Sequence, residues 1–187
     1  MKVFKSTSLL VRKGRAPVQR NLQLFIIALF GSIMFVTRMF VPAPIDRMLI
    51  AVDAVLLALS TLFVKKVGAT YVGAVGGILT SLWRPTLIPF SIIYALIYGA
   101  IVDASAFLFK VKATNEGVNR NKLMAAMAFS TLLIGFISYY ATTMFPQIIQ
   151  AYAAIDMIVA FMGPVTGAVA GYAAAYLWNR YLKSIPL

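Results

Sequence analysis

The chain contains neither cysteine nor histidine among its 187 residues. Without thiolate and imidazole ligands, the usual protein sites for zinc, copper, haem and iron–sulfur clusters cannot be built from this sequence. Cysteine nucleophiles, disulfides and Ser-His-Asp triads are excluded for the same reason. The glycine-rich phosphate loop is also missing, so any use of ATP has to come from a partner. We therefore expect no enzymatic activity, no metal site and no cofactor.

Acidic residues are scarce as well, because the chain has five Asp and Glu residues against 17 Lys and Arg. Charged residues make up 12% of the sequence, hydrophobic residues 61%, and the mean hydropathy is +0.89. About a quarter of an average soluble domain is charged. The composition is typical of an integral membrane protein and excludes a soluble catalytic domain. Basic residues do not form a folded patch with interleaved aromatics, so we expect no nucleic-acid partner.

Six apolar stretches are long enough, or nearly so, to cross a lipid bilayer. They cover residues 22–41, 48–64, 67–83, 87–109, 123–145 and 153–178. Fourteen Lys and Arg residues fall on one side of this arrangement, and only Arg38, Arg47 and Arg84 fall on the other. Because cytoplasmic loops are enriched in Lys and Arg, the sequence predicts an all-α integral membrane protein of the cell membrane. Its fold is a six-transmembrane-helix bundle with both termini in the cytoplasm.

The first 21 residues are predicted to be a basic cytoplasmic tail, followed by a single membrane domain over residues 22–187. The apolar run after the tail continues to residue 41 without a convincing small-residue cleavage site. This pattern favours a retained first span over a signal peptide.

Small residues recur at four-residue spacing in five of the stretches, which lets helix backbones approach closely in lipid. They are Ala28 and Ser32; Ala54 and Ala58; Ala69, Gly73 and Gly77; Ala95 and Gly99; and Gly163, Gly167, Gly171 and Ala175. Together they predict a compact bundle with several tight crossings. Some of these stripes can instead face a partner protein.

Three of the five acids lie inside predicted spans, where a charged carboxylate costs about 2.5–3.5 kcal/mol on insertion scales. Asp53 and Asp156 lie near the outer ends of their spans, and Asp103 lies nearer the cytoplasmic end of the fourth. Two interpretations of the outer acids stay open: they bind a ligand in a pocket open to the outside, or they pair with the three outer arginines or cap helices. Asp103 is interpreted as structural, with Lys110 or a neighbouring hydroxyl as its partner.

Aromatic residues in the outer half supply stacking surfaces that suit a flat heterocyclic ligand. The alternative is the aromatic belt at the membrane interface, which fits Trp83 equally well. Tyr94 and Tyr98 lie deeper, one turn apart beside the small residues of the fourth span. The predicted substrate-binding residues are Asp53, Trp83, Tyr94, Tyr98, Tyr139 and Asp156.

A basic pair leads into a glycine-rich third span, KKVGATYVGAVGGIL at residues 65–79, and the fourth span ends in residues 99–109. With six spans and cytoplasmic termini, this pattern resembles the substrate-binding S components of energy-coupling-factor vitamin transporters. The similarity is greatest to the thiamine and hydroxymethylpyrimidine branch, and it is best over residues 56–112. The chain departs from the thiamine binders in lacking histidine and in having Tyr94 or Ala95 near the depth of their fourth-span acid.

The resemblance implies that the chain binds a small vitamin-like heterocycle from outside and docks onto a transmembrane coupling subunit that two ABC ATPases drive. The family docks through small residues of early helices, which here are Ala28 and Ser32 on the first span and Ala54 and Ala58 on the second. The second position of the family's first-helix Ala-xxx-Ala signature is serine in this chain.

The alternative is a non-catalytic accessory or scaffold subunit of a larger membrane enzyme, such as a monooxygenase or respiratory complex. A substrate-binding subunit should keep an outward-facing polar cavity of roughly 300 Å³ or more, whereas a scaffold can have filled it. The partners differ too, being ABC ATPases in one case and catalytic membrane subunits in the other. Both alternatives place the chain in a lipid bilayer.

Overall fold

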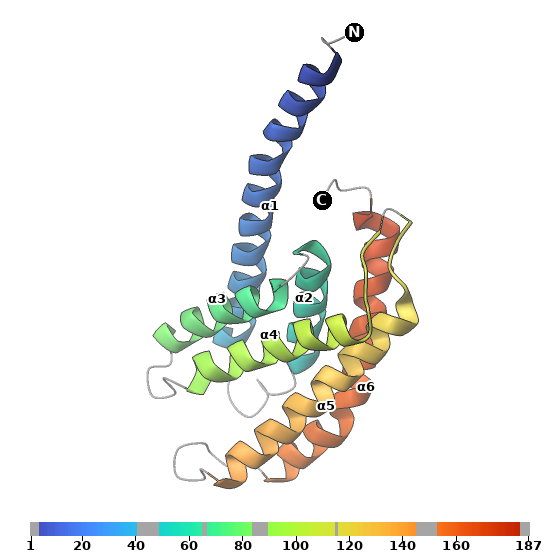
Figure 1. Ribbon diagram of the computed structural model, residues 1–187. Coiled ribbons are helices and arrows are strands. Elements are labelled where there is room, and N and C mark those ends of the chain that lie inside the picture. The colour runs from blue at the N-terminus through green and yellow to red at the C-terminus, as the bar shows by residue number, and fades with distance from the viewer. Residues whose placement is uncertain are drawn as a thin grey trace.

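The computed structural model describes residues 4–40, 49–64, 67–83, 90–114, 116–144 and 153–183, and for residues 4–19, 153–156 and 159 it describes the backbone alone. The regular structure within these ranges is helical (Figure 1). The helices are α1 (Phe4–Phe40), α2 (Ile50–Phe63), α3 (Gly68–Trp83), α4 (Phe90–Leu108), α5 (Arg120–Met144) and α6 (Ala153–Leu177). A short π-helix, Trp178–Leu182, continues α6.

In the described ranges, four helical segments are long and apolar enough to cross a membrane. They are Arg20–Phe40, Phe90–Leu108, Arg120–Met144 and Ala160–Leu182. The chain is therefore a multi-pass membrane protein, and the predicted all-helical class is confirmed. Helices α2 and α3 have 14 and 16 residues, which is shorter than the roughly 20 that a perpendicular span needs. Spanning by these two helices stays a prediction.

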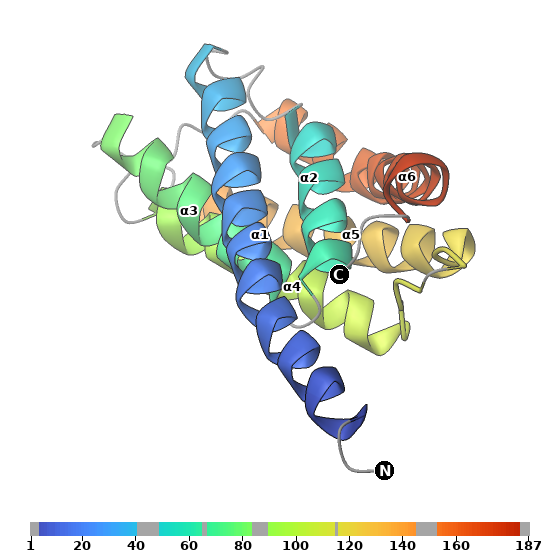
Figure 2. The same ribbon diagram turned by 90° about the horizontal axis from the view of Figure 1, so that it is seen from above.

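The first helix is longer than the apolar stretch that predicted it. Residues 4–21, expected to form a basic tail, continue α1 without a break in helical structure. Figure 1 shows this end of α1 projecting beyond the other helices. Seen from above, α2 lies between α1 and the pair formed by α5 and α6 (Figure 2).

Helices α5 and α6 form the most extensive pair in the structure. The predicted glycine stripe of α6 lies against the backbone of α5. A Cβ built on Gly167 would collide with the carbonyl oxygen of Met127, and one built on Gly171 would lie 2.8 Å from the carbonyl oxygen of Leu123. Only glycine allows the two backbones to approach this closely. The predicted tight crossing is confirmed for this pair.

A second close pair joins α3 to α4 through the small residues at its crossing. A Cβ on Gly73 would collide with the carbonyl oxygen of Ala95, and a Cβ on Gly99 would collide with that of Ala69. Each glycine thus faces the backbone of an alanine on the opposite helix. The stripes that the sequence predicted on the third and fourth spans therefore pack against each other.

Asp103 on α4 closes the other end of the α3–α4 pair. Its carboxylate accepts backbone N–H bonds from Ala69 at 3.2 Å and Thr70 at 2.8 Å, and hydroxyl bonds from Thr61 at 2.9 Å and Thr70 at 2.7 Å. The first N–H groups of a helix have no partner inside the helix, so this acid caps α3 from a neighbouring helix. The predicted structural role is confirmed with hydroxyl partners rather than Lys110.

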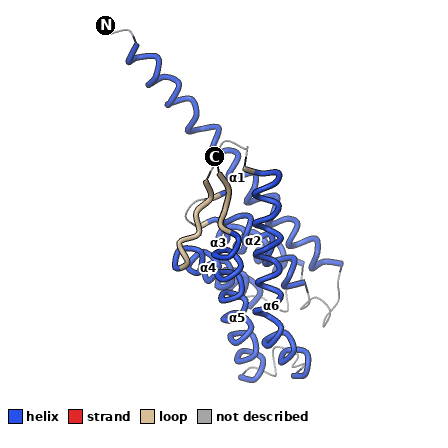
Figure 3. Tube along the Cα trace, turned by 90° about the vertical axis from the view of Figure 1, so that its right-hand side faces the viewer, coloured by secondary structure: helices blue, strands red, loops and turns tan. Residues whose placement is uncertain are grey.

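The segment that joins α4 to α5 lies beside the C-terminal end of α6 (Figure 3). The side-chain amide of Asn179 accepts the N–H of Val118 at 2.7 Å and donates to its carbonyl oxygen at 3.0 Å. Gly117 lies against the same amide with a φ of 128°, a backbone conformation that side chains disfavour. This pair of hydrogen bonds holds the loop to the helix end.

Candidate functional site

An ion pair joins the end of α1 to the beginning of α2. Arg38 lies in the last turn of α1, and Asp53 lies in the first turn of α2. The guanidinium donates from Nε at 3.1 Å and from Nη2 at 2.5 Å, both times to Oδ2 of Asp53. The helix dipole favours both positions, because it stabilises a positive charge at the C-terminal end of α1 and a negative charge at the N-terminal end of α2. For Asp53, the interpretation that it pairs with one of the three arginines expected on the outer side is confirmed, and the partner is Arg38.

The two partners differ in exposure. The side chain of Asp53 is 1% exposed and that of Arg38 is 22% exposed. The carboxylate is therefore enclosed by protein, while part of the Arg38 side chain reaches the surface. Because both donors end on Oδ2, the other oxygen, Oδ1, is left without a hydrogen-bond partner among the described residues.

Tyr98 on α4 lies next to this pair. It is the largest of the fully buried side chains, and its hydroxyl has no hydrogen-bond partner in the part of the chain that the structure describes. Asp53, Tyr94 and Arg38 are all close enough to affect Tyr98 electrostatically. One turn earlier on α4, Tyr94 directs its hydroxyl towards the carbonyl oxygen of Ile134 on α5 at 3.5 Å, the outer limit of a hydrogen bond.

The structure thus brings together three predicted site residues, Asp53, Tyr94 and Tyr98, and adds Arg38 to them. We call these four residues the outer polar cluster. It holds a buried carboxylate oxygen that can accept a hydrogen bond and a buried phenol that can donate or accept one. Buried polar atoms normally have partners, so these two atoms call for an explanation, as does Trp178 Nε1, a third such atom that lies outside the cluster.

The remaining predicted residues lie elsewhere. Trp83 at the end of α3 and Tyr139 on α5 are exposed, as residues of an interfacial aromatic belt would be. The side chain of Asp156 lies outside the described residues. Of the predicted docking residues, Ala28 and Ser32 are exposed on α1, whereas Ala54 and Ala58 are fully buried. In this conformation, a partner would meet the first pair and not the second.

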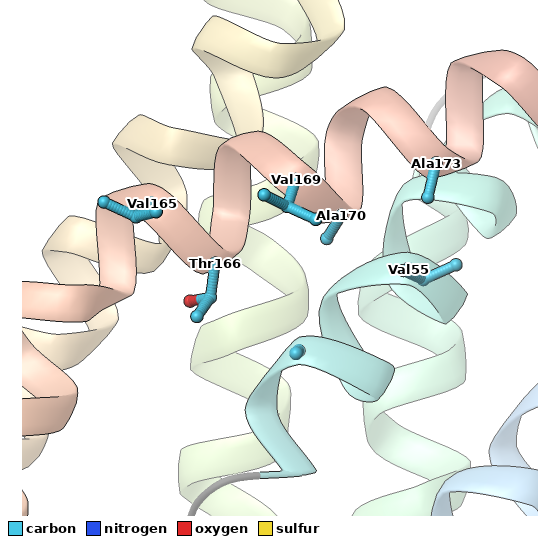
Figure 4. A pocket seen from close by; sticks show the side chains of 7 residues that line it. Val55, Val165, Thr166, Val169, Ala170 and Ala173 are labelled. Carbon is cyan, nitrogen blue, oxygen red and sulfur yellow. The ribbon is translucent and has the colours of Figure 1, made fainter.

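A cleft of about 190 Å³ lies between α2 and α6 (Figure 4). It is lined by Ala51, Val55, Val165, Thr166, Val169, Ala170 and Ala173. The Thr166 hydroxyl donates to the carbonyl oxygen of Gly163 at 2.8 Å, so the lining offers a ligand little polar chemistry. The cleft is smaller than the expected vitamin-sized cavity of roughly 300 Å³, and it shares no residue with the outer polar cluster.

The outer polar cluster offers one carboxylate, one guanidinium and two phenols, all of which can hydrogen-bond to a ligand. Among the described residues, no group of three or more acids could hold a metal ion. No protein-family model matches this chain, and neither does any curated protein or solved structure.

Proposed function

We propose that this chain is the membrane-embedded substrate-binding subunit of an energy-coupling-factor type importer for a small vitamin-like heterocycle. The observation that carries the proposal is the outer polar cluster, in which Asp53 Oδ1 and the Tyr98 hydroxyl are buried without partners among the described residues. Replacing a buried ion pair by well-packed apolar residues is often neutral or stabilising. Stability therefore does not account for the cluster, whereas a binding role accounts for its unpartnered atoms.

The position of the cluster supports capture from outside. The distribution of Lys and Arg predicts that the end of α1 and the beginning of α2 face outward. A solute arriving from that side would meet Arg38 first, because its side chain is the more exposed member of the ion pair. Tyr94 and Tyr98 add aromatic surface beside the carboxylate, which suits a flat ring with a few polar atoms.

Transport by such a subunit needs a coupling subunit and ABC ATPases, because the chain has no phosphate loop of its own. Helix α1 offers them a surface. Only 17% of its apolar window is buried, against 33–39% for the other three spanning helices. Ala28 and Ser32 lie on the exposed part of α1, where small side chains would allow another helix to approach.

A second candidate function is that of a non-catalytic accessory subunit in a larger membrane enzyme complex. The observation that favours it is closure of the outer polar cluster, since Asp53 and Tyr98 are each 1% exposed. The cleft between α2 and α6 is apolar and too small for a vitamin. A scaffold subunit without a ligand pocket would show the same closed cluster and the same small apolar cleft.

Native mass spectrometry of the protein, gently extracted from its own membrane, separates the two functions. The importer predicts a bound heterocycle, with or without ATPase subunits, that is lost in the Tyr98→Phe variant. Tyr71→Phe is the matched control, because Tyr71 is an exposed tyrosine on α3 outside the cluster. Stoichiometric association with catalytic membrane subunits, together with no small molecule, would instead establish the accessory role.

A further inference from the structure

We propose that Asp53 forms a cation-binding site, which Arg38 fills in the ligand-free protein. A cationic group of a ligand replaces Arg38 there, and the outer end of α1 is then no longer held to α2. The inference rests on the proposed function, since it assigns the substrate class and the response of that same site. The substrate class is a small molecule with a positively charged nitrogen group, such as an amidinium or an ammonium.

The ion pair uses only one of the two carboxylate oxygens of Asp53. Arginine commonly binds a carboxylate with two donors on two oxygens. Here Nε and Nη2 of Arg38 both donate to Oδ2, and Oδ1 stays without a partner among the residues described. Oδ1 is thus an unused acceptor, but it is buried, so a second cation reaches it only as the Arg38 side chain swings outward. The incoming cation then compensates the buried charge of Asp53 in place of the guanidinium.

Arg38 and Asp53 also differ in exposure and mobility. The guanidinium sits on a long flexible side chain that already reaches the surface, so it can turn into water or headgroups. The carboxylate is fixed in the first turn of α2 and is enclosed by protein. In an exchange, Arg38 is therefore the partner that moves. Tyr98 lies close enough to interact with whichever cation is present.

The ion pair also holds one end of α1 in place. Helix α1 packs on α3 near the middle of its spanning segment, Arg20–Phe40, where Gly31 lies against Val75 and Met34 against Gly76. Arg38 lies seven positions beyond Gly31, which is about 10 Å along a helix. Its ion pair ties the outer end of the least buried spanning helix to α2. Without that tie, α1 can tilt about its crossing with α3.

Such a tilt would couple ligand binding at the outer end of α1 to the position of its cytoplasmic end. Because α1 is one helix on both sides of Gly31, a displacement of its outer end moves the opposite end in the other direction. Arg20 lies about 16 Å from Gly31 on that opposite arm. Binding on the outside would thereby change the position of the cytoplasmic part of α1, where a coupling subunit would make contact.

The absence of cysteine makes a direct test straightforward, because spin labels can be placed on introduced cysteines without background. One label pair, Val36→Cys with Ile93→Cys, reports the outer end of α1 against α4. A second pair, Asn21→Cys with Ala104→Cys, reports the opposite end. All four positions are exposed on their helices. Distances are measured by pulsed electron resonance on the full chain in lipid nanodiscs.

We expect Asp53→Asn and Arg38→Gln each to shift or broaden the outer distance by several ångströms and to change the second distance as well. The Asp53→Asn variant removes the buried charge itself, so it keeps the test valid if Arg38→Gln does not fold. Tyr71→Phe should leave both distances unchanged. Unaltered distances in Asp53→Asn would overturn the release of α1.

The cation site is tested separately with guanidinium chloride at millimolar concentration as the probe. Guanidinium should raise the unfolding temperature of Arg38→Ala, measured against the same concentration of sodium chloride. It should not do so in the wild type or in the Arg38→Ala, Asp53→Asn double variant. Equal responses of Arg38→Ala and the double variant would overturn the cation site. Neither result depends on whether native extraction finds a heterocycle, so failure of the proposed function remains distinguishable.

Discussion

Removing one partner of the Arg38–Asp53 pair should have very unequal effects on stability, depending on which partner is removed. In Arg38→Met, the carboxylate of Asp53 stays enclosed, with 1% of its side chain exposed and its counter-charge gone. Breaking a buried pair in this way costs about 3–5 kcal/mol of unfolding free energy. In Asp53→Asn, the buried charge disappears together with its desolvation cost, and the guanidinium can turn to the surface. We expect a loss of about 1 kcal/mol there, the net value of a typical hydrogen bond.

The double variant Arg38→Met, Asp53→Leu extends this prediction. It replaces the pair by apolar side chains, which in buried sites is often neutral or stabilising by about 1–4 kcal/mol. We therefore expect the double variant to be far more stable than Arg38→Met alone and at least about as stable as the wild type. That result would mean that the ion pair contributes no net stability to the fold, as the proposed binding role requires.

The assay is reversible unfolding in mixed micelles, followed by the fluorescence of the two tryptophans. Trp178 is a suitable reporter, because its ring is buried and packs edge-on against Phe63 at a centroid distance of 5.0 Å. Similar losses for Arg38→Met and Asp53→Asn would refute the reasoning, since they would show that the carboxylate finds other compensation. A double variant as unstable as Arg38→Met would refute it as well.

The other predictions concern contacts that hold the fold together. Asp103→Leu should cost about 3 kcal/mol or more, because it leaves two N–H groups of α3 without their cap, and thermal unfolding measures this loss. Asp103→Asn should recover only part of it, because the amide keeps one acceptor oxygen and places an NH2 donor against the other N–H group. Gly73→Ala should lower the free energy of unfolding by about 1–3 kcal/mol, because its Cβ would collide with the backbone of α4. Ala104→Gly, on the exposed face of α4, should lower it by about 1 kcal/mol. A smaller loss in Gly73→Ala than in Ala104→Gly would contradict the close packing of α3 and α4. Asn179→Leu should increase hydrogen exchange at Val118 by at least tenfold, and unchanged protection would show that the loop is held by other contacts.

Hydropathy and the spacing of small residues were enough to predict most of the helix packing. The glycines of α6 meet α5, and those of α3 and α4 meet each other, because close backbone approach needs small residues at four-residue intervals. The same spacing could not tell an internal contact from a docking surface. Ala54 and Ala58 are buried, while Ala28 and Ser32 are exposed, and only the rotation of each helix decides between them.

The polar site was predictable in part. Asp53, Tyr94 and Tyr98 were recognisable as unusual residues within apolar stretches, and the structure brings them together. Arg38 carried a signal as well, because it is a charge on the side of the bundle that is poor in Lys and Arg. Its pairing with Asp53 depends on how α1 and α2 are aligned with each other. Periodicity within a single helix does not determine that alignment.

The backbone cap on Asp103 and the helical state of residues 4–21 are further cases in which the sequence was insufficient. A buried acid needs partners, but which N–H groups it reaches follows from how α3 and α4 are aligned. A run of basic residues before an apolar span is typical of a solvated tail, yet the same residues also continue a helix well. Composition therefore predicted their charge environment and not their backbone conformation.

The central claim, that the outer polar cluster binds a small molecule, is tested most directly by equilibrium dialysis against the small-molecule fraction of the source cells. Retained compounds are identified by mass spectrometry for the wild type, Asp53→Asn, Tyr98→Phe and the control Tyr71→Phe. We predict a cationic heterocycle that the wild type and the control enrich and that both cluster variants fail to enrich. Equal enrichment by all four proteins, or enrichment by none of them, would contradict the claim.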